Sequence, residues 1–260
     1  MEFIPDILTL LAGAAVGFSL GLIGGGGSIL ATPLLLYVVG IDEPHVAIGT
    51  GALAVSVSAY LNFLNYARTG SVRWGCAAIF ASVGALGAYV GSSLGKAFNG
   101  DWLLFGFGLV MVIIALAMLK PRNLSSHKPV ERGFGPAARL GGVAAPVGIA
   151  AGFFGIGGGF LIVPGLILAT GMPIINAIST SLFAVGSFGL TTAVNYAASD
   201  LVNWTVAAKF ITGGVLGGFL GIKLAVHLCR YRHALNLIFA FVVLSVAFYM
   251  LWQTAQKIMA

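Results

Sequence analysis

Charged residues are scarce in this sequence of 260 amino acids. Lysine and arginine number 13 and aspartate and glutamate 7, so charged residues make up 8% of the chain, whereas soluble domains carry about 25%. Hydrophobic residues account for 59%, and the mean hydropathy is +1.03. So few charges cannot cover a water-soluble surface of this size. The composition excludes a soluble globular enzyme, a disordered chain and a nucleic-acid-binding module.

The net charge of +6 and the pI near 9.6 would otherwise suggest a nucleic-acid partner. In a membrane protein the same excess is expected, because lysine and arginine gather in cytoplasmic loops and set the orientation of the chain. The sequence therefore predicts a protein whose solvent is the lipid bilayer, with no nucleic-acid partner.

Cysteine is also nearly absent. Cys76 and Cys229 lie far apart in apolar surroundings, and neither has the spacing of a metal ligand or a second cysteine nearby. We interpret both as small buried hydrophobic residues, and we expect no metal and no cofactor. The first residues lack the basic start of a secretory signal and carry Glu2 and Asp6 instead. We therefore expect the first stretch to be a membrane element that is retained in the mature protein.

Long apolar stretches occupy most of the chain. A helix needs roughly 20 apolar residues to cross the hydrocarbon core. Short polar breaks separate the apolar stretches, which are 5–39, 45–67, 73–95, 101–120, 139–170, 174–197, 203–226 and 233–256. The pattern predicts an all-α, polytopic integral membrane protein with about eight hydrophobic segments. The first and fifth stretches are too long for one simple span, and glycine runs interrupt them.

One longer polar segment divides the chain. Residues 120–139 read KPRNLSSHKPVERGFGPAAR and hold three prolines and five of the thirteen basic residues. The predicted organisation is a first transmembrane repeat at 1–121, a basic cytoplasmic linker at 122–137 and a second transmembrane repeat at 138–260.

The two halves resemble each other in sequence. GLIGGGGSILATP at 21–33 aligns without a gap with GFFGIGGGFLIVP at 152–164. After a shift of one residue the match continues, with AIGT at 47–50 against AIST at 177–180. Farther on, asparagine–tyrosine–alanine triplets, single tryptophans and spaced glycines also match. A long, nearly gapless internal match predicts a duplication. In membrane proteins, duplicated halves around glycine-interrupted helices are typical of secondary transporters.

Loop charges indicate how the halves are oriented, because cytoplasmic loops prefer lysine and arginine. Loop 67–73 carries two arginines, whereas its counterpart 197–203 carries an aspartate and no base. Loop 95–101 is near neutral, whereas its counterpart 223–232 carries three bases. Equivalent loops thus have opposite bias, which predicts inverted repeats. The simplest solution gives each half three full spans plus a glycine-broken, re-entrant element that returns to its own side.

The glycine runs are the most informative feature for function. Gly24–Gly27 and Gly157–Gly159 disfavour a continuous helix, since each glycine costs about 1 kcal/mol relative to alanine. Backbone groups freed in lipid are tolerated only where they are buried in protein or line a cavity. We expect half-helices at 28–39 and 160–169, with N-terminal N–H groups that point into the middle of the protein. Such ends suit an anion, and two of them would converge on one site. Close packing is the alternative role, and we prefer it for glycines at small-xxx-small spacing.

Polar residues beside these breaks complete the predicted substrate site. Neutral hydroxyl and amide donors suit a weakly basic oxoanion that must both enter and leave. Hydrogen bonding between helices is the alternative role for each of them. The predicted substrate-binding residues are Gly24, Gly25, Gly26, Gly27, Ser28, Thr50, Asn65, Tyr66, Gly157, Gly158, Gly159, Thr180, Ser181, Asn195 and Tyr196.

Acidic residues are missing from the middle of the spans. All seven lie at or near predicted ends and loops, which argues against a carboxylate-based proton relay. Lys209 is the one base well inside a predicted span, five residues after Trp204. We expect its ammonium to reach the interface, and an anion-attracting role is the alternative.

The paired motifs GLIGGGGSILATPLL and GFFGIGGGFLIVPGL, with AIGT and AIST downstream, make the chain resemble the sulfite exporter TauE/SafE family, also called the toluene sulfonate uptake permease family. The resemblance covers nearly the whole chain. It implies a multi-pass carrier of the bacterial inner membrane that moves a small sulfur-containing anion such as sulfite, sulfoacetate, thiosulfate or an aryl sulfonate. It identifies neither the anion nor the direction of transport.

The function expected from the sequence is therefore alternating-access transport of such an anion, held by half-helix N-termini and neutral donors. An anion channel is the alternative within transport. An integral-membrane enzyme would need a mid-span acid, base or metal group that the sequence lacks. A membrane assembly subunit would need no duplicated polar centre. The chain could also form a homo-oligomer.

Overall fold

Every element of the protein is a helix in the residues that the computed structural model describes, which are 3–68, 70–119, 134–155, 159–227 and 232–259. The first half contains α1 (Phe3–Ile23), the 3₁₀ helix η1 (Gly25–Leu30), α2 (Ala31–Tyr37), α3 (Pro44–Ala67), α4 (Trp74–Ala97) and α5 (Gly100–Leu119). The second half contains α6 (Phe134–Phe154), α7 (Gly159–Thr170), α8 (Ile174–Ala197), α9 (Trp204–His227) and α10 (Arg232–Met259). Apart from η1, the order of the described elements is thus the same in both halves.

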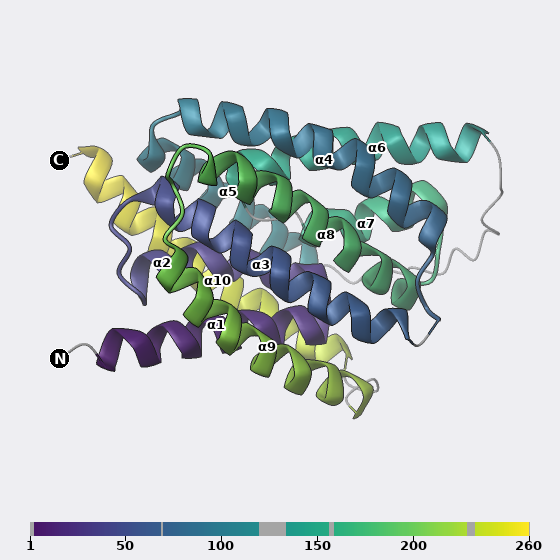
Figure 1. Cartoon of the computed structure of the whole chain (residues 1–260), viewed down its shortest axis with the longest axis horizontal. Helices are drawn as coiled ribbons and strands as arrows, with labels where there is room; N and C mark the ends of the chain where they lie inside the picture. Colours follow the sequence, from purple (N-terminus) through teal and green to yellow (C-terminus); the bar gives the residue numbers. More distant parts are fainter. Residues whose placement is uncertain (1–2, 69, 120–133, 156–158, 228–231, 260) are drawn as a thin grey trace.

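The helices run between two ends of the molecule (Figure 1). At the terminal end, α1 begins at Phe3 and α10 ends at Met259. At the linker end, α5 ends at Leu119 and α6 begins at Phe134. In the first half, α1 leaves the terminal end and α2 returns to it, before α3, α4 and α5 cross in turn. In the second half, α6 leaves the linker end and α7 returns to it, before three more crossings.

The contacts between the halves come in matched pairs. Helix α1 packs on α9, and its counterpart α6 packs on α4, the counterpart of α9. Helix α3 packs on its own counterpart α8, and α5 packs on its counterpart α10. Equivalent helices of the two halves therefore make equivalent contacts across the interface between the halves. This pairing, together with the opposite directions of α1 and α6, favours the interpretation of inverted repeats.

Glycines make these contacts close. A Cβ atom placed on Gly17 of α1 would overlap the backbone oxygen of Gly214 in α9. In the matching seam, a Cβ atom on Gly148 of α6 would overlap the backbone oxygen of Gly84 in α4. The sequence assigned Gly17, as part of a small-xxx-small pattern, to helix packing, and this close approach confirms that role. The sequence did not predict that the partner helix belongs to the other half.

Seven of the described helices are long and apolar enough to cross a membrane, and the remaining apolar helical segments are shorter. Large apolar side chains point outward on these helices, for example Leu86 at 73% exposure and Leu216 at 64%. In water such a surface would be unstable, but in a bilayer it faces the lipid. Trp74 and Trp204, which are equivalent in the repeat, are both exposed and begin α4 and α9 at opposite ends. Tryptophan in these places is typical of the membrane–water interface.

Charge is distributed unequally between the two ends. The described acids all lie at the terminal end: Asp6, Asp42, Glu43, Asp101 and Asp200. The described side chains at the linker end instead include four bases and no acid: Arg68, Arg73, Arg139 and Lys223. Loop 67–73 and the end of α9 lie together at this end, as the sequence predicted (Figure 1). By the preference of cytoplasmic loops for basic residues, this distribution favours the predicted placement of the linker end on the cytoplasmic side.

Candidate functional site

The first glycine break separates α1 from η1. Gly24 has a φ of 79°, a left-handed conformation that side chains rarely adopt, and its N–H donates to the Leu20 carbonyl to close α1. The chain then continues at once as η1 from Gly25. The sequence placed the start of this half-helix at Ser28, three residues too late. The tighter 3₁₀ turn explains the difference, because such turns are common at the start of an α-helix and tolerate glycine.

The second glycine break follows α6. Gly155 has a φ of 67°, so it stands in the same left-handed region as its repeat equivalent, Gly24. Helix α7 begins at Gly159, one residue before the predicted start. Two of the predicted site residues, Gly157 and Gly158, lie outside the described residues.

The two breaks meet in the interior. A Cβ atom on Gly25 would lie 2.5 Å from the Cα atom of Gly159 and 2.7 Å from its carbonyl oxygen, so the two backbones touch there. Both glycines are buried. On either side, Gly24 abuts the side chain of Ile178 in α8, and Gly155 abuts that of the equivalent Ile48 in α3. The structure thus brings the start of η1 and the start of α7 together, between the central helices of both halves.

The glycines of the first run differ in the space around them. A Cβ atom on Gly26 would meet only two side-chain atoms, at 3.4 Å in Ile23 and 4.0 Å in Phe239. A Cβ atom on Gly27 would overlap the backbone of α1. Ser28 is fully buried and donates its hydroxyl to the Gly25 carbonyl at 2.9 Å. Gly25 and Gly27 are therefore fixed by close backbone contacts, whereas Gly26 has ordinary room beside it.

The predicted threonines have partners in the opposite half. Thr50 in α3 accepts a hydrogen bond from the Asn203 N–H at 2.9 Å, before α9. Its equivalent Thr180 in α8 accepts one from the Arg73 N–H at 3.1 Å, before α4. Both side chains are fully buried. These hydroxyls hold the start of one half's helix against the other half, while the binding role predicted for them stays a prediction. Ser181 donates to the Ile178 carbonyl at 2.8 Å, within its own helix.

The two asparagine–tyrosine pairs differ in surroundings although their sequences match. In the first half, Asn65 donates to the Leu61 carbonyl of its own helix and to no other group among the described residues. The Tyr66 hydroxyl donates to the Gly21 carbonyl near the first break. In the second half, the Asn195 amide donates to the hydroxyls of Ser92 and Ser93 in α4, at 2.7 and 3.0 Å. The hydroxyl of Tyr196 is buried without a hydrogen-bond partner.

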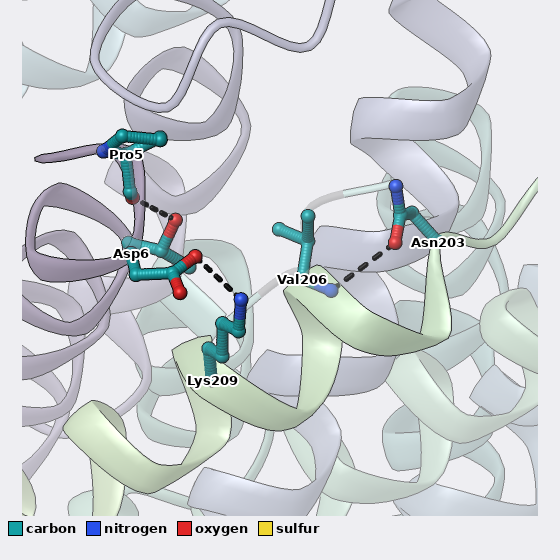
Figure 2. A network of polar contacts seen from close by, with 6 residues as sticks. Pro5, Asp6, Asn203, Val206 and Lys209 are labelled. Carbon is teal, nitrogen blue, oxygen red and sulfur yellow. Dashed lines mark hydrogen bonds and ion pairs between the residues drawn. The ribbon is translucent and has the colours of Figure 1, made fainter. Parts of the chain in front are cut away.

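Two lysines at the terminal end, Lys209 and Lys96, have different partners, and the sequence drew attention only to Lys209. Lys209 pairs with Asp6 of α1, as Figure 2 shows, so its charge is neutralised across the α1–α9 seam. Lys96, near the end of α4, bonds instead to neutral oxygens of Asn195 and Ser199. Lys96 did not stand out in the sequence, because loop 95–101 is near neutral. One feature of the sequence could have identified it: no carboxylate stands three or four residues before or after Lys96.

Comparison with known proteins agrees with the architecture. Residues 9–250 match the family model described as "Sulfite exporter TauE/SafE". A "Probable membrane transporter protein" of Xylella fastidiosa (strain Temecula1) is 54% identical over 258 residues, which cover 98% of each chain. A protein with the same description from strain 9a5c is 52% identical over the same extent. No solved structure matches the chain.

These matches cover almost the whole length of the chain, including both glycine breaks. Proteins that span the bacterial outer membrane are β-barrels, so a helical multi-pass chain of this kind belongs in the inner membrane. The protein is a multi-pass membrane transporter, and it belongs to the sulfite exporter TauE/SafE family.

Proposed function

We propose that the protein is a secondary transporter that carries a sulfur-containing anion across the bacterial inner membrane by alternating access. Sulfite, thiosulfate, sulfoacetate and organic or aryl sulfonates are the candidate substrates. The proposal rests on one observation above all, the meeting of the two glycine breaks at Gly25 and Gly159 in the buried interior.

The chemistry of this meeting point suits an anion. The first N–H groups of a helix have no acceptor within the helix, and together they act as a partial positive charge. Here the starts of η1 and α7 lie against each other, and no described acid lies near them in the sequence. The Ser28 hydroxyl already donates to the Gly25 carbonyl, whereas the backbone N–H groups at the starts of η1 and α7 offer neutral donors. Such donors bind an oxoanion without holding it so tightly that it cannot leave.

The packing of the halves supports alternating access. Each half begins with two helices joined at a glycine break, α1 with α2 and α6 with α7. In the first half α1 packs on α9 of the other half, and in the second half α6 packs on α4 of the other half. If one half tilts against the other, both of these helix pairs move, and the meeting point can open first towards one end and then towards the other. The glycine seams at Gly17 and Gly148 present smooth backbone surfaces, which permit small sliding movements.

Transport by purified protein in proteoliposomes tests this proposal. A panel of sulfite, thiosulfate, sulfoacetate and toluene sulfonate would be supplied with and without a pH gradient, and with labelled substrate trapped inside for counterflow. We expect saturable uptake of at least one of these anions, accelerated by the same anion on the opposite side. Flux that neither saturates nor shows counterflow would identify a channel instead. The absence of flux for the whole panel would refute the proposed substrate class.

A further inference from the structure

Lys96 is a cation without an acidic partner. Its ammonium, half-buried near the end of α4, donates to the carbonyl and side-chain oxygens of Asn195 at 2.8 and 2.9 Å, and to the hydroxyl of Ser199 at 2.8 Å. It forms no ion pair with any carboxylate in the described part of the chain. Lys209 at the same end is paired with Asp6. The positive charge of Lys96 is thus solvated only by neutral oxygens.

Next to this charge lies the ring of Tyr196, whose hydroxyl is buried without an acceptor among the described residues. The Tyr196 side chain is fully buried, and its hydroxyl has no hydrogen-bond partner. Its ring lies 5.9 Å from the ammonium nitrogen of Lys96. The equivalent Tyr66 donates to a carbonyl, so the repeat does not require an unpaired hydroxyl. A buried polar group without a partner costs stability and calls for an explanation such as a missing ligand.

The surroundings of the Tyr196 hydroxyl connect it with the second break. A Cβ atom on Gly95 would lie 3.4 Å from this hydroxyl and 2.6 Å from the Phe153 carbonyl oxygen, near the end of α6. The rings of Phe98 and Phe153 pack edge to face beside it, with centroids 5.3 Å apart. A cation, a free hydroxyl and an aromatic pair thus adjoin the last turn before Gly155.

We propose that Lys96 and Tyr196 form an anion-recognition site at the terminal end of the transport path, in which Lys96 supplies the charge and Tyr196 a hydrogen bond. The site takes an oxoanion of the sulfonate or sulfite class, and the inference rests on the anion transport proposed above. Of the residues around this site, the sequence assigned a binding role only to Asn195 and Tyr196. The charge of Lys96 would let a path lined with neutral donors select for anions at its entrance.

The chemistry of the pair fits such a ligand. An ammonium has three N–H donors, all occupied by neutral oxygens here. One acceptor, Ser199, is exposed, so an anionic oxygen can replace it and form a stronger, charge-assisted bond. A sulfonate or sulfite group carries three oxygens, so a second one can accept from the Tyr196 hydroxyl. The Phe98–Phe153 pair then lies where an organic tail would pack.

Four variants of the full-length protein separate this role from a structural one. Lys96→Gln keeps hydrogen bonding but removes the charge, and Lys96→Arg keeps the charge. Tyr196→Phe removes only the hydroxyl. Lys257→Gln is the control, since it removes an exposed charge without a described partner from the same end. Each variant would be assayed for sulfite and methanesulfonate uptake at low and high ionic strength, and for thermal unfolding with and without these anions.

We expect Lys96→Gln to raise KM by about tenfold or more, as removal of a focusing charge does, and to abolish most of its dependence on ionic strength. Lys96→Arg should recover most of the affinity. Tyr196→Phe should raise KM and weaken the thermal stabilisation by the anion, without lowering the unfolding temperature of the anion-free protein. Lys257→Gln should behave like the unmodified chain.

The outcomes separate the two proposals. If the unmodified protein transports an anion while Lys96→Gln and Tyr196→Phe keep its KM and salt dependence, the recognition site is refuted and the transporter proposal stands. If Lys96→Gln lowers only the maximal rate and the unfolding temperature, Lys96 is a structural link between α4 and α8, and the recognition site is again refuted. If the unmodified protein neither transports nor is stabilised by any anion of the panel, the proposed function itself fails.

Discussion

Replacing Gly25 with alanine places one methyl group where the two glycine breaks touch. That methyl carbon would lie 2.5 Å from the Cα atom of Gly159 and 2.7 Å from its carbonyl oxygen. Two non-bonded carbon atoms prefer a separation of about 3.5–4.0 Å. The backbones of η1 and α7 must therefore separate by roughly 1 Å, because the obstructing atoms are backbone atoms and no side chain can rotate away.

The expected effect on stability is modest and the effect on transport large. Overpacking of this kind costs about 1–3 kcal/mol, and alanine's better helix propensity offsets about 1 kcal/mol of it. The net loss of roughly 0–2 kcal/mol should leave folded protein in the membrane. The geometry of the meeting point changes by about 1 Å, a displacement that costs on the order of a hundredfold in enzyme sites. We expect at least a tenfold loss of initial uptake rate for Gly25→Ala.

Gly26→Ala is the matched control, because it adds the same methyl group one residue later in the same helix. Its Cβ atom would meet only Ile23 and Phe239 side chains, at ordinary contact distances. Both variants would be purified, checked for a monodisperse elution profile and assayed at equal protein density in proteoliposomes. Gly26→Ala should retain most of the activity. Equal rates for Gly25→Ala and the unmodified protein, or an equal loss in both variants, would refute the idea that the substrate binds where the breaks meet.

Three shorter predictions concern the scaffold. Gly17→Leu should abolish the yield of folded protein, measured by fluorescence-detected size exclusion, because the side chain would overlap the backbone of α9. In a chain without its native cysteines, Arg68→Cys and Lys223→Cys should react with an impermeant maleimide from one side of the membrane and Asp200→Cys from the other; any other pattern contradicts the inverted halves. Thr180→Val should lower the free energy of unfolding by about 1 kcal/mol, because the loop N–H that it accepts from loses its partner.

The sequence predicted features that depend only on the backbone conformation of a short segment. A run of glycines signals a break, and the structure places Gly24 and Gly155 in left-handed conformations at the ends of α1 and α6. The all-helical, multi-pass class followed from hydropathy, although seven of the described helices are long enough to span a membrane where the sequence predicted about eight apolar segments. The orientation of the basic loops in the membrane stays a prediction. The start of η1 was misplaced because the sequence does not tell a 3₁₀ turn from an irregular segment.

The sequence did not predict which helix or loop of the same chain packs against a given residue. Small-xxx-small spacing indicates that another backbone approaches Gly17 but not that α9 supplies it. The repeat identified Thr50 and Thr180 as a pair, but their acceptor role depends on which loop lies opposite each of them. Lys96 was overlooked because its loop looked near neutral; the sequence shows that no carboxylate stands three or four residues from it, but the oxygens of Asn195 and Ser199 that accept from it depend on the fold.

Asn65 and Asn195 occupy equivalent positions in the repeat but have different surroundings in the structure. The sequence assigns the same role to Asn65 and Asn195. Among the described residues, Asn65 bonds only within its own helix, whereas Asn195 donates to two serines of α4 and accepts from Lys96. The repeat equivalent of Lys96 is Val226, so no lysine stands at the corresponding position of the other copy.

Truncation of each asparagine should therefore have unequal effects on stability. Asn195→Ala leaves the half-buried ammonium of Lys96 with fewer acceptors, and a hydrogen bond to a charged group is worth about 1.5–3 kcal/mol. We expect a loss of that size for Asn195→Ala and less than about 0.5 kcal/mol for Asn65→Ala, as for an ordinary surface substitution. Reversible unfolding in detergent measures both values. Equal losses would mean that the α4–α8 network contributes no more than the helix-internal bond of Asn65. A larger loss for Asn195→Ala would mean that the network around Lys96 and Asn195 stabilises the contact between α4 and α8 at the terminal end.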